Sequence, residues 1–338
     1  MAYLRAYKFA FVRIISKFTI LMRTLFLIAY CFLATQAYPQ KQHHNPKVML
    51  GMETYAFLKG QDAALKKVAS EFPALKKDAI AVAKSSRVLF GRAAINIERF
   101  LKEELGSREF NILQRRIDSL VNEQLEQPIE QEQYARDFIE KAKSEIGLAK
   151  TEGIHKSIIS FAYHDAPHQE ITDGHIIHFT TKRHPKAEKS AVILSIPKSW
   201  RAEEAQMSAT IQQFTSHDGK GIEKIMIMVH DLDKQDQDIV LSENSIPSML
   251  APRARLIRTE PVTIDGVAGM MVEAEEELNL SPDKKKIRML QFMFAHNQKL
   301  YCLQGSIGPA NLQQNLEGHI KKYEPLFRLV AARTQIID

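Results

Sequence analysis

Apolar side chains in residues 61–153 recur at the spacing of a helix. Between Leu65 and Ala93 they alternate three and four residues apart, which is the heptad pattern of helices that pack on one another. Two further stripes of the same period occupy residues 110–124 and 135–149. Because the connections between the stripes are short, neighbouring helices should be antiparallel. The pattern predicts a three-helix bundle or a long helical hairpin. The stripes would be buried within it or, as an alternative, would bind a partner.

The breaks between these stripes contain residues that start and stop helices. Pro73 suits the first turn of a helix that follows Ser70 or Phe72, because proline loses no helical hydrogen bond there. Gly106 predicts the end of one helix, and Ser107 is placed to cap the next.

From about residue 158 the period changes to two, the alternation of half-buried strands. Runs of this kind cover residues 158–163, 174–179, 191–196, 209–214, 223–229, 269–274, 288–294 and 299–303. The pairs Asp218-Gly219 and His296-Asn297 separate such runs and are typical of hairpin turns. Strands this close together, mostly without helices between them, predict an antiparallel sheet.

An amphipathic helix is expected from about Asn311 to Ala332. Its apolar face is broad enough to cover a sheet and consists of Leu312, Leu316, Ile320, Tyr323, Phe327 and Val330. Upstream, Pro197 should end a strand, and Trp200 should close one end of the core. The predicted fold class is therefore α+β: an N-terminal helical bundle or hairpin, followed by an antiparallel sheet packed with a C-terminal helix.

Three stretches within residues 191–337 show a further layout. Val192-Ile-Leu-Ser-Ile-Pro-Lys-Ser-Trp200 is a strand that runs into Pro-x-x-Trp, and Val262-Thr-Ile-Asp-Gly-Val-Ala-Gly-Met-Met-Val272 contains a Gly-bearing turn. Lys299-Leu-Tyr-Cys-Leu303 and the last helix with Phe327 complete it. In these stretches the chain resembles the PsbP-like domain family, named for an accessory protein of photosystem II and also found in exported bacterial proteins. The resemblance implies a sheet backed by helices and a binding or assembly role without enzymatic activity.

Residues 1–37 have the three parts of a secretory signal. A basic head precedes the apolar run 25–34, and Ala34-Thr-Gln-Ala37 places small residues where a signal peptidase requires them. We expect export, to the periplasm or the medium, with cleavage after Ala37 and with Met22 as a second candidate for the start. An uncleaved anchor over 9–34 is disfavoured by its three basic residues. A lipoprotein anchored at Cys31 is disfavoured by the bulky Tyr30. The expected plan is a signal peptide (1–37), a linker (38–60), a helical segment (61–153) and a PsbP-like α+β domain (154–338).

The net charge of +6 belongs to this leader. The chain has 46 Lys and Arg against 40 Asp and Glu, and residues 1–37 contain five of the basic residues and no acid. The remainder is nearly neutral, which gives no electrostatic case for nucleic-acid binding.

Cleavage would leave Cys302 as the last cysteine, so no internal disulfide can form. Since Cys302 lies in a strand-like apolar run, we expect a buried, inert thiol.

Histidines give the strongest hint of a metal site. Six of the twelve fall between His155 and His184, and the candidate ligands are His164, His168, His175 and His178. Zinc requires three or four converging ligands, whereas His175 and His178 would point to opposite faces of a strand. A polar linker with an edge strand is the competing interpretation. The acidic loop 231–238 fails as an EF-hand, because Asp236 and Ser242 stand where a glycine and a bidentate glutamate are needed.

The chain contains no G-x-S-x-G, P-loop or G-x-G-x-x-G motif. We therefore expect no enzyme and no cofactor, but an exported binding or assembly protein of the cell envelope. Its protein partner would be bound through residues 61–153. Two alternatives stay open: a metal-binding protein or metal-dependent hydrolase that uses the cluster His155–His184, and a small ligand bound between the sheet and the C-terminal helix near Trp200.

Overall fold

The structure, a computed structural model, describes residues 45–146, 153–187, 190–205, 208–232, 241–280 and 283–337. It divides into two compact units: a helical unit of residues 45–90 and 97–146, and an α+β unit of residues 91–96 and 153–337. The expected signal peptide with its cleavage site, and most of the acidic loop 231–238, lie outside the described residues. In the part that is described, no helix is both long and apolar enough to cross a membrane.

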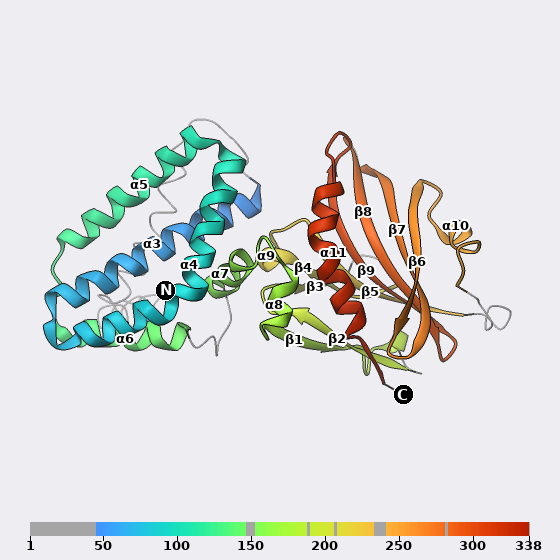
Figure 1. Ribbon diagram of the computed structural model, residues 1–338, viewed down its shortest axis with the longest axis horizontal. Coiled ribbons are helices and arrows are strands. Elements are labelled where there is room, and N and C mark those ends of the chain that lie inside the picture. The colour runs from blue at the N-terminus through green and yellow to red at the C-terminus, as the bar shows by residue number, and fades with distance from the viewer. Residues whose placement is uncertain are drawn as a thin grey trace, which may run out of the picture. The chain divides into compact units, whose positions relative to one another are not determined.

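Long helices make up the first unit (Figure 1). They are α3 (Pro46–Glu71), α4 (Lys76–Leu105), α5 (Ser107–Glu126) and α6 (Glu132–Ile146), with a 3₁₀ turn, η2 (Pro73–Leu75), after α3. Pro73 opens η2, at a first turn as the sequence predicts. The heptad stripe is buried within the unit, in a core shared by α3, η2, α4 and α6 that consists of Leu65, Val68, Leu75, Ala79, Val82, Ala135, Ile139 and Ala142. Four long helices therefore replace the three that the stripes indicate.

Two boundaries in this unit correct the sequence analysis. Residues 46–60, expected as linker, are helical: Asn45 accepts a hydrogen bond from Lys47 N at 3.0 Å, and Pro46 occupies the first helical position. This is a capped start. Ser107 is the first residue of α5, and its side chain makes no capping bond; Gly106, with φ of 80°, forms the break instead.

The α+β unit contains two antiparallel sheets. A three-stranded sheet has the order β1-β2-β10, and a seven-stranded sheet has the order β3-β4-β5-β9-β8-β7-β6. The strands are β1 (Ile176–Thr180), β2 (Ala191–Pro197), β3 (Arg201–Glu203), β4 (Thr210–Thr215), β5 (Glu223–Asp231), β6 (Ala254–Ile264), β7 (Val267–Leu280), β8 (Asp283–His296), β9 (Lys299–Asn311) and β10 (Gln335–Ile337). The helices are α7 (Ile154–Ala162), α8 (His168–Thr172), α9 (Ser216–Gly219), α10 (Ile246–Met249) and α11 (Glu317–Ala332), and η3 (Pro185–Ala187) is a 3₁₀ turn. The α+β class is confirmed.

Two predicted elements in this unit are wrong. Residues 158–163, expected as a strand, lie almost entirely in α7, where every side chain from Ser157 to Ala162 is buried. The last helix begins at Glu317 and not at Asn311, because Asn311 still belongs to β9 and is paired with Lys285 of β8.

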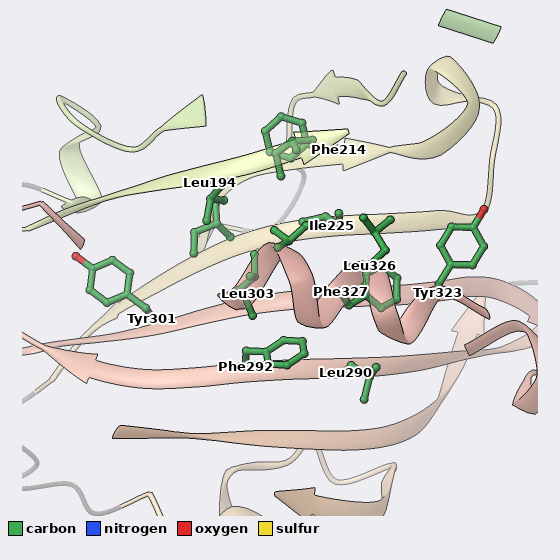
Figure 2. Close-up of a cluster of buried hydrophobic side chains, with 14 of the residues drawn as sticks. Leu194, Phe214, Ile225, Leu290, Phe292, Tyr301, Leu303, Tyr323, Leu326 and Phe327 are labelled. Carbon is green, nitrogen blue, oxygen red and sulfur yellow. The ribbon is translucent and has the colours of Figure 1, made fainter. Parts of the chain in front are cut away.

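One face of the large sheet packs against α11. Leu290, Phe292 and Leu303 point from the strands toward Leu326 and Phe327 of the helix (Figure 2). Trp200 lies in the same core and meets the ring of Tyr323 edge-on, with centroids 6.4 Å apart. Because successive strand residues alternate between faces, Met270, Met293 and Cys302 lie on the other face and form a second core.

Ion pairs also hold α11 against the large sheet. Arg288 of β8, almost fully buried, donates to Glu273 at 2.9 Å and to Glu317 of α11 at 3.2 Å. Arg258 of β6 likewise contacts both Glu273 and Glu324 of α11. Each carboxylate of α11 is thus matched by a cation on the sheet, which sets where the helix crosses the strands.

Candidate functional site

A left-handed turn joins β4 to β5. His217 has φ and ψ of 50° and 49°, Asp218 has 50° and 41°, and Gly219 has φ of 84°. Left-handed backbone costs a non-glycine residue roughly 1–2 kcal/mol, and such strain concentrates at functional or tightly constrained positions. The turn directs Ser216 and His217 inward, where both are buried. A Cβ at Gly221 would lie 1.8 Å from the Ser216 hydroxyl oxygen and 2.4 Å from Oε2 of Glu223, so a larger residue there would displace these side chains.

Glu223, the first residue of β5, is the centre of a buried polar cluster. Its side chain is fully buried, and its carboxyl group accepts a hydrogen bond from the Ser216 hydroxyl. Nε2 of His319, on α11, lies 2.7 Å from its Oε1. The Tyr323 hydroxyl is also hydrogen-bonded to Glu223, and burial together with the charge of Glu223 raises the pKa of Tyr323 well above its ordinary value. The cluster therefore joins the left-handed turn, β5 and α11.

The order of these groups differs from that of a nucleophilic triad. In a triad the imidazole lies between the hydroxyl and the carboxylate, so that it can take the hydroxyl proton. Here the Ser216 hydroxyl donates directly to the Glu223 carboxyl, and Nδ1 of His217 lies 3.1 Å from the serine oxygen and 3.8 Å from Oε2 of Glu223. Ser216 and His217 are also closed off from solvent, while His319 is one-quarter exposed. This arrangement can hold a turn and a helix together, but it does not present an activated hydroxyl to a substrate.

A second buried acid, Glu170 of α8, faces the loop after β2. Its carboxyl accepts hydrogen bonds from Ser199 N at 2.7 Å and from Ser199 Oγ at 2.8 Å. Burial raises the pKa of Glu170 to about 7, although the bonds from Ser199 and the charge of Lys156 act in the opposite direction. The two bonds hold the chain at Ser199, immediately before Trp200, against α8.

The raised pKa of Glu170 predicts a pH-dependent stability. Between the ordinary pKa near 4.5 and the folded value of about 7, the folded state binds a proton that the unfolded state has lost. Its stabilising contribution is therefore complete below pH 4.5 and is lost as the pH rises through 7. We expect the urea midpoint, followed by the fluorescence of Trp200, to fall between pH 5 and 8, and Glu170→Gln to flatten that fall. Glu277→Gln, at an exposed carboxyl of β7, should leave the slope unchanged. An equal slope in wild type and Glu170→Gln would contradict the assignment.

The structure places the four candidate metal ligands at separate points. His164 lies in the bend after α7, its ring 5.7 Å from that of His217 between centroids, and His168 is the first residue of α8. His175 precedes β1 and packs against Tyr163, with ring centroids 5.6 Å apart. His178, in β1, has Nδ1 3.5 Å from the Ser195 hydroxyl. Among the described residues, no three side chains of His, Cys, Asp or Glu are gathered as a metal would require.

Cys302 is buried in β9, as the sequence analysis predicts, and burial raises the pKa of its thiol to about 12. A thiol that keeps its proton at neutral pH is a poor nucleophile.

The remaining candidate regions are the acidic loop and the layer near Trp200. Asp231, at the start of the acidic loop, lies 2.7 Å from Nζ of Lys299. The layer near Trp200, where a small ligand was one alternative, is filled by core side chains.

The helical unit presents a different kind of site, an exposed apolar face on α4. Ile80 and Val88 are 53% and 74% exposed, and their spacing of eight residues places them on one side of the helix. Exposed Lys77, Lys84 and Arg87 lie among them or beside them. From Lys76 to Phe90 the helix contains four basic residues and one acid, Asp78. We call this surface the α4 face.

Sequence reasoning missed both the polar cluster and the α4 face. Glu223 could have been noticed as a lone acid at the start of an apolar strand, and His319 as a lone histidine beside the apolar stripe of the last helix. Nothing in the sequence pairs them, since 96 positions separate them.

No protein-family model matches the chain, and no curated protein matches it. Among solved structures, the chain is similar to the solution structure of cyanobacterial PsbP (CyanoP) from Synechocystis, with 13% identity, 47% of this chain and 92% of that chain covered, and a TM-score of 0.33. It is also similar to the crystal structure of LpqN, described as involved in cell envelope biogenesis of Mycobacterium tuberculosis, with 12% identity, 50% and 95% covered, and a TM-score of 0.32. Each likeness spans about half of this chain.

Proposed function

We propose that this chain is an exported, non-enzymatic binding or assembly protein of the cell envelope, and that its helical unit binds a protein partner through the α4 face. The observation on which the proposal rests is the exposure of Ile80 and Val88. Burying a valine or isoleucine side chain is worth roughly 1.5–3 kcal/mol, and exposed apolar residues that share one face indicate an interaction site more than singly scattered ones do.

The charges around the α4 face indicate the chemistry of the partner. Lys77, Lys84 and Arg87 surround the aliphatic residues, and the acid Asp78 lies on another side of the helix. A complementary surface would have an apolar centre and an acidic rim, the ordinary arrangement of a protein interface. The leader, the resemblance to PsbP-like domains and the closed polar cluster support the envelope location and the absence of catalysis in this proposal.

Site-specific photo-crosslinking tests the proposal in intact cells. A photoreactive residue at position 88 should give a discrete adduct in the envelope fraction, because Val88 is the most exposed of the aliphatic residues. The same residue at Asn122, exposed on α5, serves as the matched control and should give none. Reversing the adjacent charges with Lys84→Glu and Arg87→Glu should reduce the adduct at least tenfold.

Two results would contradict this proposed function. One is the absence of an adduct from position 88, and the other is an adduct that survives the charge reversal, since contact without charge complementarity would be indiscriminate. The Lys84→Glu, Arg87→Glu variant should keep the helical content of the wild type, because both side chains are exposed and their replacement leaves the core intact.

A further inference from the structure

Sulfur-bearing side chains form a row across the large sheet, on the face opposite α11. In the strand register Met228 of β5 is paired with Cys302 of β9, Cys302 with Met293 of β8, and Met293 with Met270 of β7. Residues directly opposite each other in a ladder share a face. Four adjacent strands therefore present Met, Cys, Met and Met side by side.

The surroundings of the row add further sulfur. Met226 and Met289 lie on the same face two and four residues from members of the row, and Met249 of α10 packs over the layer. Six of the twelve methionines in the chain thus belong to this one layer. The opposite face, under α11, holds mainly aromatic and branched aliphatic side chains, with Met271 as its methionine.

Thioether and thiol sulfurs are soft ligands, and among biological metals they select Cu(I) over harder ions. We propose that this row is a Cu(I) site, with Met228, Cys302 and Met293 as its ligands. Cross-strand neighbours have Cβ atoms about 4.5–5.5 Å apart, and methionine has three rotatable bonds in its side chain. Cys302 lies between the two methionines, so the thioethers of Met228 and Met293 can turn toward its sulfur from either side.

Charge and access fit the same ion. The row contains no charged side chain, and the adjacent row contains Gln291 hydrogen-bonded to Gln304 at 2.8 Å. When Cu(I) binds, the Cys302 thiol would release its proton to solvent. The resulting thiolate would neutralise a monovalent ion, whereas a divalent ion would leave a buried net charge, which is costly. Met228 is half-buried and gives the row an edge toward solvent, while Met293 and Cys302 are 6% exposed and shielded by Ile246 and Val272. Such an apolar shell keeps water from the metal.

Anaerobic titration of the full chain with Cu(I), in competition with a chromogenic Cu(I) chelator, tests the assignment. We expect one Cu(I) per chain to be withheld from the chelator, with an absorption-edge spectrum that shows sulfur ligands alone. Met293→Leu and Cys302→Ala should each weaken binding at least tenfold. Met228→Leu, at the half-buried edge, should do so with the least change in the core, since leucine and methionine have similar volumes.

Met271→Leu is the matched control, because Met271 is the next residue to Met270 on β7 and faces the α11 core. It should bind Cu(I) like the wild type. Trp200 fluorescence and far-ultraviolet circular dichroism confirm that each variant is folded before titration. The proposal is overturned if the chelator removes all copper from the wild type, if Met271→Leu weakens binding as much as Met228→Leu, or if the spectrum shows nitrogen ligands from histidine.

Discussion

Replacing Glu223 with leucine should destabilise the α+β unit by about 4 kcal/mol, within the range measured for removing one partner of a buried charged pair. The change leaves the Ser216 hydroxyl, the Tyr323 hydroxyl and the His319 imidazole without the carboxyl group that they share. Each buried polar group left unsatisfied costs about 1–3 kcal/mol. Equilibrium unfolding in urea, followed by fluorescence, measures the loss. Trp200, the single tryptophan of the chain, is buried in this unit beside Tyr323.

Two variants separate lost hydrogen bonds from lost packing. Glu223→Gln keeps an oxygen that can accept from Ser216 and should cost less than half as much as Glu223→Leu. Adding Ser216→Ala to Glu223→Leu should restore part of the stability, because it removes an orphaned hydroxyl. Glu277→Leu, at an exposed position of β7, should stay within about 0.5 kcal/mol of the wild type. Equal losses for Glu223→Leu and Glu223→Gln, with no recovery from Ser216→Ala, would show that the polar cluster is not what holds the turn to α11.

Periodic segments of the fold were predictable because their hydrophobic pattern is a direct record of burial. The strands β2 and β5 match predicted runs to within two residues, and β9 begins at Lys299 as predicted but continues to Asn311. The turn at His296-Asn297 joins β8 to β9 as expected. In β5 and β9 the side chains alternate between the two faces of the large sheet, and each face has its own core. Strands buried on both faces appear in the sequence as short apolar runs.

The predictions fail in segments whose side chains are buried without a regular alternation, because the sequence then shows no periodic hydrophobic pattern. In α7 every residue from Ser157 to Ala162 is buried, so the helix shows a continuous apolar run that a short strand would also show. The start of α3 was predicted wrongly for another reason. Its buried stripe passes through Gly51, Thr54 and Gln61, which do not count as hydrophobic when the sequence is read. The local signal, Asn45 followed by Pro46, was the better guide.

The candidate sites were beyond sequence reasoning because each is a product of register or topology. A strand register shifted by one residue would move Cys302 to the other face, away from Met228 and Met293. Glu223 meets His319 only because α11 returns across the sheet to the beginning of β5. Histidines that are close in sequence, by contrast, lie in different elements. His164 is in a bend, His168 begins a short helix and His178 is in a strand.

Adding one methyl group at Gly305 should cost about 3 kcal/mol, at the upper end of what overpacking a core costs. Gly305 lies in β9 directly beneath α11, and a Cβ there would lie 2.2–2.4 Å from three ring carbons of Phe327. Phe327 is 1% exposed and sits among Leu303, Leu326 and Tyr323, so its ring has no space into which to move (Figure 2). Gly305→Ala should lower the urea midpoint measured by Trp200 fluorescence, and the helix must shift away from the sheet.

Gly318→Ala and a compensating change at Phe327 make this result specific. No atom lies within 4 Å of a Cβ at Gly318, on α11, so alanine there should be neutral or stabilise by up to about 1 kcal/mol. Combining Gly305→Ala with Phe327→Leu should cost less than the sum of the two single changes, because the smaller side chain vacates the position that the new methyl group needs. If the free-energy changes of the two substitutions were strictly additive, the cost of Gly305→Ala would arise elsewhere in β9 and not from contact with Phe327. A positive coupling would instead mean that β9 and α11 are in direct contact at this point. The layer between sheet and helix would then have no room for a ligand beside Phe327.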